Sequence, residues 1–352
     1  MKPIAHIGWK SPSNIAFIKY WGKSGEQYPQ NPSLSMTLSK CVTTTRIKVF
    51  KQQSNKISID FTFKFDGSEE PAFAGRIHKY LMAISNRISF LHKYKLEIES
   101  SNSFPHSAGI ASSASAMSAL ALCLVSLENA LGDSKPYDIF REAAVLARLA
   151  SGSATRSLYG GFVNWGEIDG TSESSNEYGS PLNFEVASIF KNLNDSILII
   201  DSGKKKVSSS VGHALMNGHP YADQRFINAR NNLNELLGVL RAGDFKKFSR
   251  ILEMEALSLH ALMMTANPWY TLLAPNTLTA IQSIRDFREK TKTRLTFTLD
   301  AGPNVHLIYP RAEEKTVHNF IDSELRNLCA KGQVIYDGLG NGPEPVVESV
   351  IP

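Results

Sequence analysis

The chain has 352 residues, of which 42% are hydrophobic and 20% charged, and its formal net charge is +5 at pH 7. This composition is typical of a soluble globular protein, and the length allows one large domain or two ordinary ones. The small positive balance suits an enzyme with anionic ligands and argues against a nucleic-acid-binding protein.

The first half of the chain alternates between strand and helix patterns. Its most apolar helix, 114–131, is interrupted by serines and Glu128, so we expect it to be too short to span a bilayer. The polar stretch 169–181 is predicted to be a surface excursion. In chain order, the patterns predict strands at 14–20, 43–50, 56–65 and 94–100, helices at 76–91, 114–131 and 137–150, and a strand-like segment at 160–167.

In the second half, long helices are separated by short strands. This mixture favours an α+β fold of two layered domains that meet around 185–195. We therefore predict an N-terminal domain over 1–190 and a C-terminal domain over 191–352. The expected elements are strands at 196–200, 294–299, 304–309 and 333–336, and helices at 220–242, 244–264, 278–291 and 313–331.

The three cysteines, Cys41, Cys123 and Cys329, are scattered and form no CxxC pair. Their number and spacing argue against a disulfide framework and a structural zinc site, and they indicate a cytoplasmic location. The N-terminal residues contain no long apolar run, so we expect no secretory signal. No group of His, Asp and Glu has the spacing of a metal site, and we expect no nucleic-acid or membrane partner.

A loop of small residues precedes the helix at 114–131. The first N–H groups of a helix lack intrahelical partners, so a helix start is a natural anion site. Glycine and alanine let the backbone approach a phosphate, and serines add donors. The loop lacks the lysine of a P-loop, and tight helix packing alone would also explain its small residues. The candidate nucleotide-binding residues are Pro105, Ser107, Ala108, Gly109, Ile110, Ala111, Ser112 and Ser113.

Three other segments carry residues suited to anion chemistry. In strict strand alternation Lys19 and Lys23 would share one face and could hold an anion between them, although lysines flanking a core tryptophan are commonly just solvated. Arg156 lies among small hydroxyl residues, and its guanidinium can bind two oxygens of a phosphate or carboxylate, or cap a helix end. Asp300 ends a strand before Ala-Gly-Pro, where an aspartate can also be a plain turn residue.

These motifs resemble those of a known family. The loop at 105–113 resembles the second motif of the GHMP kinase superfamily, with Ile110 in place of the usual leucine. Residues 14–23, 151–161, 204–210 and 298–305, in this order, resemble the mevalonate diphosphate decarboxylases, although Lys206 stands where that family usually has aspartate. The resemblance implies a two-domain GHMP kinase fold, with a ribosomal protein S5 domain 2-like N-terminal domain and a ferredoxin-like C-terminal domain.

The resemblance also implies a reaction, ATP and Mg²⁺ as cofactors, and a homodimer. ATP would phosphorylate the C3 hydroxyl of (R)-5-diphosphomevalonate, and loss of that phosphate with CO₂ would give isopentenyl diphosphate. Asp300 would act on the hydroxyl, Lys19 would be its cation partner, and Arg156 would position anions. The implied substrate-binding residues are Asn14, Tyr20, Trp21, Gly22, Lys23, Arg76, Ser151, Gly152, Ser153, Ala154, Thr155, Arg156 and Ser210.

Several alternatives stay open at this stage. A relative could act on the 5-monophosphate, or could be a mevalonate 3-kinase that stops after phosphorylation. More distant alternatives are another GHMP small-molecule kinase or an inactive homologue. His106 and His306 have no role implied by the resemblance, and we expect neither to do chemistry.

Overall fold

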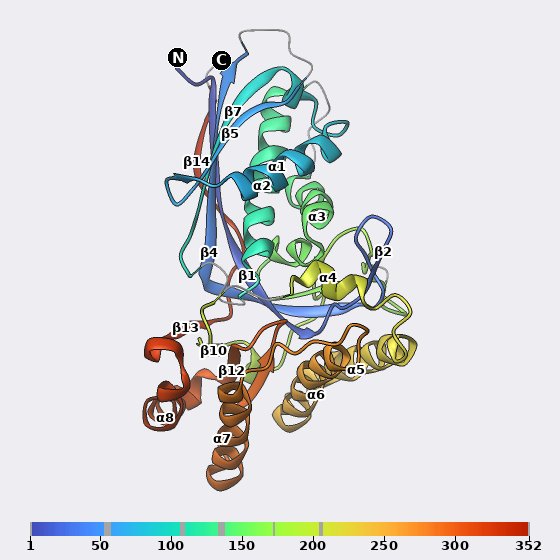
Figure 1. The fold of residues 1–352 in the computed structure, drawn as a ribbon, viewed down its shortest axis with the longest axis vertical. Coiled ribbons are helices and arrows are strands. Elements are labelled where there is room, and N and C mark those ends of the chain that lie inside the picture. Colours follow the sequence, from blue (N-terminus) through green and yellow to red (C-terminus); the bar gives the residue numbers. More distant parts are fainter. Residues whose placement is uncertain are drawn as a thin grey trace.

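The structure is a computed structural model that describes residues 2–52, 58–105, 110–132, 138–171, 173–203 and 207–350. Figure 1 shows a long twisted sheet with helices on one side in its upper part, and a smaller sheet with further helices in its lower part. The two long strands β1 (Ala5–Ile18) and β4 (Ser33–Lys51) run from the upper part down to the junction.

The larger sheet is built around the antiparallel pair of β1 and β4, which extends from Ala5 opposite Val49 to Ile18 opposite Leu34, with register shifts after Pro12 and after Ala16. Its strand order is β14-β1-β4-β7-β5-β6, and β8 pairs with β4 and β9. The other strands of this sheet are β5 (Asp60–Phe65), β6 (Ser68–Glu69), β7 (Tyr94–Asn102), β8 (Phe162–Trp165), β9 (Ser180–Pro181) and β14 (Glu344–Val350).

The strand β14 is absent from the sequence prediction, which places the last strand at 333–336. It pairs antiparallel with β1, with Ala5 opposite Val350 and Lys10 opposite Glu344. The end of the chain therefore joins a sheet that its first residues form. The boundary predicted near residue 190 stays a prediction.

Three helices cover one face of the larger sheet: α1 (Pro71–Ile84), α2 (Ser112–Leu131) and α3 (Ile139–Ala150). Among the described residues, α2 is the one helix whose length and composition would let it cross a bilayer, so the expectation that it is too short is wrong. Since 67% of its apolar window is buried inside the protein, α2 has the burial expected of a central core helix.

The smaller sheet is antiparallel in the order β11-β12-β10-β13. The predicted helix at 313–331 is a regular α-helix only over α8 (Glu314–Phe320). The chain then passes into a π-turn at Ile321, and Lys331 has a φ of 53°, which is not helical. The elements of this part are β10 (Leu193–Leu198), β11 (Thr296–Leu299), β12 (Val305–Pro310), β13 (Val334–Gly338), α4 (Ser209–Ala214), α5 (Ala222–Ala242), α6 (Phe245–Met264), α7 (Pro275–Thr291) and α8 (Glu314–Phe320).

The two parts share a hydrophobic core at their junction. Phe17, near the end of β1, is fully buried and lies edge-on to Phe248 of α6, with ring centroids 5.3 Å apart. The same buried cluster holds Leu34 of β4 and Ile197 of β10. This packing fixes the lower end of β1, and therefore the residues that follow it, against the second part of the chain.

We expect Phe17→Ala to lower the free energy of unfolding by about 3–5 kcal/mol, because it opens a cavity in this shared core. Phe61→Ala is the matched control, since Phe61 lies half-buried on β5 toward the margin of the larger sheet. Chemical denaturation of both variants measures the difference. A loss at Phe17 no larger than that at Phe61 would show that the junction is loosely packed.

Candidate active site

The candidate site begins where β1 ends. Lys19 follows β1 directly, and its side chain is only 2% exposed. Its ammonium lies 3.1 Å from Oδ1 of Asp300 and donates a hydrogen bond to the carbonyl oxygen of Ala16. Asp300 follows β11 and is 24% exposed, so its carboxylate contacts a buried cation and is itself partly accessible to solvent. The predicted pairing of Lys19 with Asp300 is confirmed.

The charge state of Lys19 is set by two opposing effects. Burial lowers the pKa of its ammonium, and the Asp300 carboxylate acts in the opposite direction. A buried cation is costly unless an anion stands next to it, so Lys19 depends on Asp300 for its charge. The pair therefore links the end of β1 to the end of β11, which are 281 residues apart in sequence.

Arg156 is a second buried cation. It lies in the 3₁₀ turn Gly152–Ser157 at 3% exposure, and donates hydrogen bonds to Asn14 Oδ1 at 3.3 Å and Ser33 Oγ at 2.6 Å. Burial lowers the pKa of Arg156 to about 10, while Asp300 and Tyr20 oppose that shift. Among the described residues no carboxylate forms an ion pair with this guanidinium, so it is suited to binding an anionic ligand.

An aromatic stack lies beside these cations. The His213 ring, on α4, lies 4.3 Å from the Tyr20 ring and 4.6 Å from the Trp21 ring, centroid to centroid. Its Nδ1 accepts a hydrogen bond from the backbone N–H of Gly22, whose φ of +93° favours glycine. Burial lowers the pKa of His213 to about 3, with positive charge at Lys23 and Arg156 acting in the same direction, so the ring is neutral at pH 7.

The expectation that Lys19 and Lys23 share a strand face is wrong. The strand β1 ends at Ile18, and the chain turns at Gly22 before the short strand β2 (Lys23–Ser24). Lys19 is consequently buried, whereas Lys23 is half-exposed and donates to Oε1 of Gln27 at 3.0 Å.

The predicted loop at 151–156 packs closely against the aromatic stack. A Cβ added to Gly152 would lie 2.8 Å from both the Tyr20 hydroxyl and the Trp165 ring, so only glycine fits there. Asn14 donates to the backbone oxygen of Ser153 at 3.2 Å. Ala154 is fully buried, and Thr155 Oγ1 accepts the N–H of Gly179 at 2.6 Å, so these two side chains support the loop from inside.

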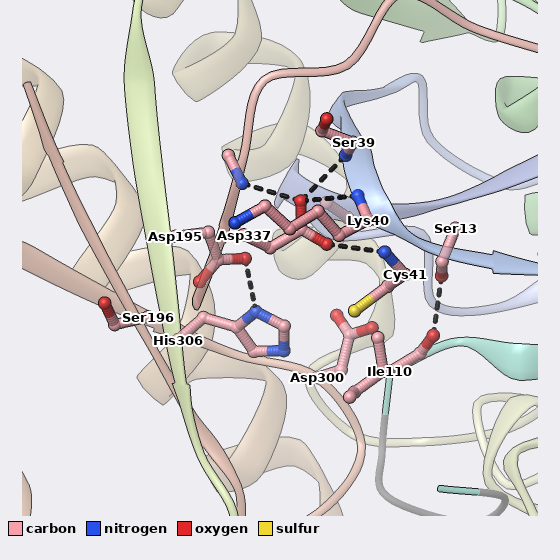
Figure 2. Close-up of polar contacts among 12 residues, drawn as sticks. Ser13, Ser39, Lys40, Cys41, Ile110, Asp195, Ser196, Asp300, His306 and Asp337 are labelled. Carbon is pink, nitrogen blue, oxygen red and sulfur yellow. Dashed lines mark hydrogen bonds and ion pairs between the residues drawn. The ribbon is translucent and has the colours of Figure 1, made fainter. Parts of the chain in front are cut away.

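The start of α2 lies close to this loop, because the hydroxyls of Ser113 and Ser151 are 3.4 Å apart. Ala111 precedes the helix with a φ of +43° and provides no side-chain cap, so within the part of the chain that the structure describes the first N–H groups of α2 have no cap from the N-cap residue. Ser13 donates to the backbone oxygen of Ile110 at 2.6 Å and ties this segment to β1 (Figure 2). Pro105 and Ser112 are described on either side, whereas Ser107, Ala108, Gly109 and His106 lie outside the described residues.

Two predicted substrate-binding residues have no contact with the Lys19–Asp300 pair among the described residues. Arg76 lies exposed on α1, the helix in the upper part of Figure 1, and its guanidinium is 5.9 Å from the centre of the Phe73 ring. Ser210 is exposed on α4, the short helix that also carries His213. Their binding roles stay predictions.

A buried polar cluster lies under the site. The Asp337 carboxylate on β13 accepts the backbone N–H groups of Ser39, Lys40 and Cys41 at 2.7–2.8 Å, which ties the smaller sheet to β4 (Figure 2). Next to it, His306 Nδ1 lies 2.7 Å from Asp195 Oδ2, and both side chains are buried. Burial raises the pKa of Asp195, and His306 acts against that shift.

Comparison with known proteins gives the family. A model described as the diphosphomevalonate decarboxylase-like N-terminal domain matches residues 11–176, and one described as the mevalonate 5-diphosphate decarboxylase C-terminal domain matches residues 196–343. The diphosphomevalonate decarboxylase of Gibberella zeae is 32% identical over 320 residues, which cover 87% of this chain and 80% of that protein. This chain belongs to the diphosphomevalonate decarboxylase family.

Solved structures agree with this assignment. The mevalonate diphosphate decarboxylase of Staphylococcus aureus superposes with a TM-score of 0.83 at 29% identity, covering 97% of this chain and 98% of that one. A structure of MDDEF in complex with MVAPP, AMPPCP and magnesium has a TM-score of 0.81 at 28% identity, covering 98% and 99%. The α+β GHMP kinase fold expected from the resemblance is thus confirmed.

The sequence reasoning missed His213 and the buried acidic residue Glu255. His213 lies three residues after the predicted binding residue Ser210, and Glu255 is a single carboxylate on the apolar face of a long helix. A charged residue at a core position of an amphipathic helix is a usable signal, because such residues are rarely buried without a partner.

The lowered pKa of His213 predicts an acid-sensitive decarboxylase fold. The unfolded chain binds a proton at His213 below about pH 6.5, whereas the folded chain resists it down to about pH 3. This contribution to stability is therefore present above pH 6.5 and is lost as the pH falls. We expect the free energy of unfolding to fall by about 2 kcal/mol between pH 7 and pH 5 for this reason.

His213→Asn tests this, because the Asn oxygen can accept the Gly22 N–H but cannot titrate. Denaturant unfolding of both proteins at pH 7 and pH 5 should show a pH dependence smaller by about 2 kcal/mol in the variant. Equal pH dependence in the two proteins would show that His213 titrates normally.

Proposed function

We propose that this protein catalyses the ATP-dependent decarboxylation of (R)-5-diphosphomevalonate to isopentenyl diphosphate, ADP, phosphate and CO₂. The observation that carries the proposal is the Lys19–Asp300 pair, which sets a carboxylate between a buried cation and open space in a member of this family. The residues that bind and react are proposed in the following steps.

Asp300 would act first, on the C3 hydroxyl of the substrate. Its carboxylate would orient the hydroxyl and accept its proton while the oxygen attacks the γ-phosphorus of ATP. Lys19 would keep Asp300 ionised, since an ammonium 3.1 Å away favours the charged carboxylate.

Decarboxylation follows from that phosphorylation. The C3–O bond breaks and phosphate leaves with the bonding electrons, so positive character develops at C3. The C1–C2 bond then breaks, CO₂ departs, and its electron pair forms the C2–C3 double bond of the product. The side chain of Arg156 is buried and has no carboxylate partner among the described residues. It would hold a phosphate or carboxylate group of the substrate in position for this step.

The start of α2 would bind the ATP phosphates. Its N-cap residue, Ala111, makes no side-chain cap to the first N–H groups, and Ser112 and Ser113 add hydroxyl groups. The described residues hold no group of three or more His, Cys, Asp or Glu side chains that could bind a metal ion by themselves. This fits Mg²⁺ held largely by phosphate oxygens, as is usual for that ion, and Mg²⁺ would supply charge neutralisation there. MDDEF bound with AMPPCP and magnesium supports both ligands.

We also propose a cytoplasmic location, which the cysteine pattern indicates, and a homodimer, which the family resemblance implies. All three cysteines are free and buried, which is compatible with a reducing compartment. Gel filtration with light scattering would measure the oligomeric state.

Asp300→Asn should lower kcat by roughly 10²–10⁴-fold with little change in KM, because the amide cannot accept the proton. ADP and CO₂ should fall together, since decarboxylation waits on phosphorylation. Separate assays of the two products, with a thermal unfolding control, measure this. Normal ADP formation with lost CO₂ would assign Asp300 to the later step.

Arg156→Leu should raise KM and lower kcat, together costing about 1.5–3 kcal/mol of transition-state stabilisation.

A separate assay of the parent protein should compare mevalonate, its 5-phosphate and its 5-diphosphate, and we expect the 5-diphosphate to be turned over far better. Turnover of the 5-monophosphate at an equal rate would favour a phosphomevalonate decarboxylase, and ADP without CO₂ would favour a 3-kinase.

A further inference from the structure

The backbone of Lys19 is held by groups from the second half of the chain. Its N–H donates to Glu255 Oε2 at 2.9 Å. Its carbonyl oxygen accepts one hydrogen bond from Arg225 Nη2 and another from Asn31 Nδ2, both at 3.0 Å. The peptide groups on both sides of the Lys19 Cα are therefore fixed by buried, directional contacts.

The two groups from the second half form an ion pair. Arg225 of α5 binds Glu255 of α6 with both Nη atoms, each 2.7 Å from one carboxylate oxygen. Asn232 of α5 adds a third hydrogen bond to Glu255 at 2.7 Å. Arg225 is 4% exposed and Glu255 is fully buried. Burial acts to raise the pKa of Glu255, but Arg225, the Lys19 N–H and Asn232 outweigh it and lower the pKa.

A buried ion pair is a poor way to stabilise two packed helices, because apolar side chains of similar size do this at least as well. Among the described residues, the side-chain hydrogen bonds of Arg225 and Glu255 that reach outside α5 and α6 all go to the Lys19 backbone. The pair thus makes specific contacts with the residue whose ammonium meets Asp300.

The helix α6 holds the other half of the Lys19–Asp300 pair as well. His260 Nε2 lies 3.1 Å from the backbone oxygen of Asp300, and because a carbonyl only accepts, Nε2–H is the donor. Glu255 and His260 both lie on α6, so hydrogen bonds from one helix hold the backbones of both Lys19 and Asp300.

We propose that Arg225 and Glu255 are positioning residues for catalysis, which fix the Lys19 backbone so that its ammonium meets the Asp300 carboxylate at a set distance. This inference rests on the proposed function, in which that pair acts on the substrate hydroxyl. A shift of about 1 Å in such a pair can reduce a rate on the order of 10²-fold, so the effect of losing these contacts is measurable.

The test variant is the double replacement Arg225→Met with Glu255→Met, because removing both charges together avoids an unpaired buried ion. We expect a folded protein with a kcat reduced by about 10–100-fold and a KM for ATP within twofold of the parent. Arg225→Lys is the second variant. It keeps a charge opposite Glu255 but loses the planar fork that also reaches Lys19, so we expect a smaller loss of kcat in the same direction.

The chain offers a matched control two residues earlier on α6. Glu253 forms an ion pair with Arg288 of α7 and has no contact with Lys19 among the described residues. Glu253→Met with Arg288→Met removes an ion pair from the same helix, and we expect kcat to stay within twofold of the parent. Circular dichroism and thermal unfolding of all variants compare their folding.

Lys19→Met separates this inference from the proposed function. If Lys19→Met keeps the parent kcat, the proposed catalytic pair is wrong. If Lys19→Met lowers kcat, the next protein should carry Lys19→Met together with the Arg225→Met and Glu255→Met replacements. We expect its kcat to be less than twofold below that of Lys19→Met alone. Parent-like kcat in the folded double variant, or in Arg225→Lys if the double variant does not fold, would overturn the positioning role. Full additivity with Lys19→Met would overturn it equally.

Discussion

The ammonium group of Lys19 is the constraint around which the site is built. A lysine at 2% exposure needs an anion beside it, and the anion available is Asp300, at the end of a strand in the other sheet. Bringing the two together requires β1 to reach the junction of the two parts, and the shared core around Phe17 and Phe248 holds it there. Packing, charge and proposed chemistry meet at one residue.

The residues that carry the proposed chemistry could be predicted because they lie in short, contiguous motifs. Lys19, Arg156 and Asp300 each stand in such a segment, and the structure brings the first and last into contact. The position of Glu255 on the apolar face of its helix is a local signal, but the contacts of Arg225 and Glu255 with Lys19 span 206 and 236 residues and leave no local pattern. Long-range contacts of this kind are set by helix packing, which a one-dimensional pattern does not record.

The errors in the predicted elements have similar causes. Strict alternation does not hold over residues 19–23, because β1 ends at Ile18 and the chain turns at Gly22, which has a positive φ. The serines of α2 do not interrupt it, because they are accommodated inside: Ser115 and Ser118 are fully buried and hydrogen-bonded to Thr43 and Ser11. The strand β14 was missed because its short sequence gains its structure from pairing with β1.

That pairing has a consequence for synthesis of the chain. Until residues 344–350 leave the ribosome, one edge of β1 stays without its neighbour β14, so the larger sheet cannot be completed before they emerge. The nascent first part would expose an unpaired strand edge until those residues emerge. A chaperone that binds extended backbone would have its longest access there, and premature termination would leave that edge open permanently.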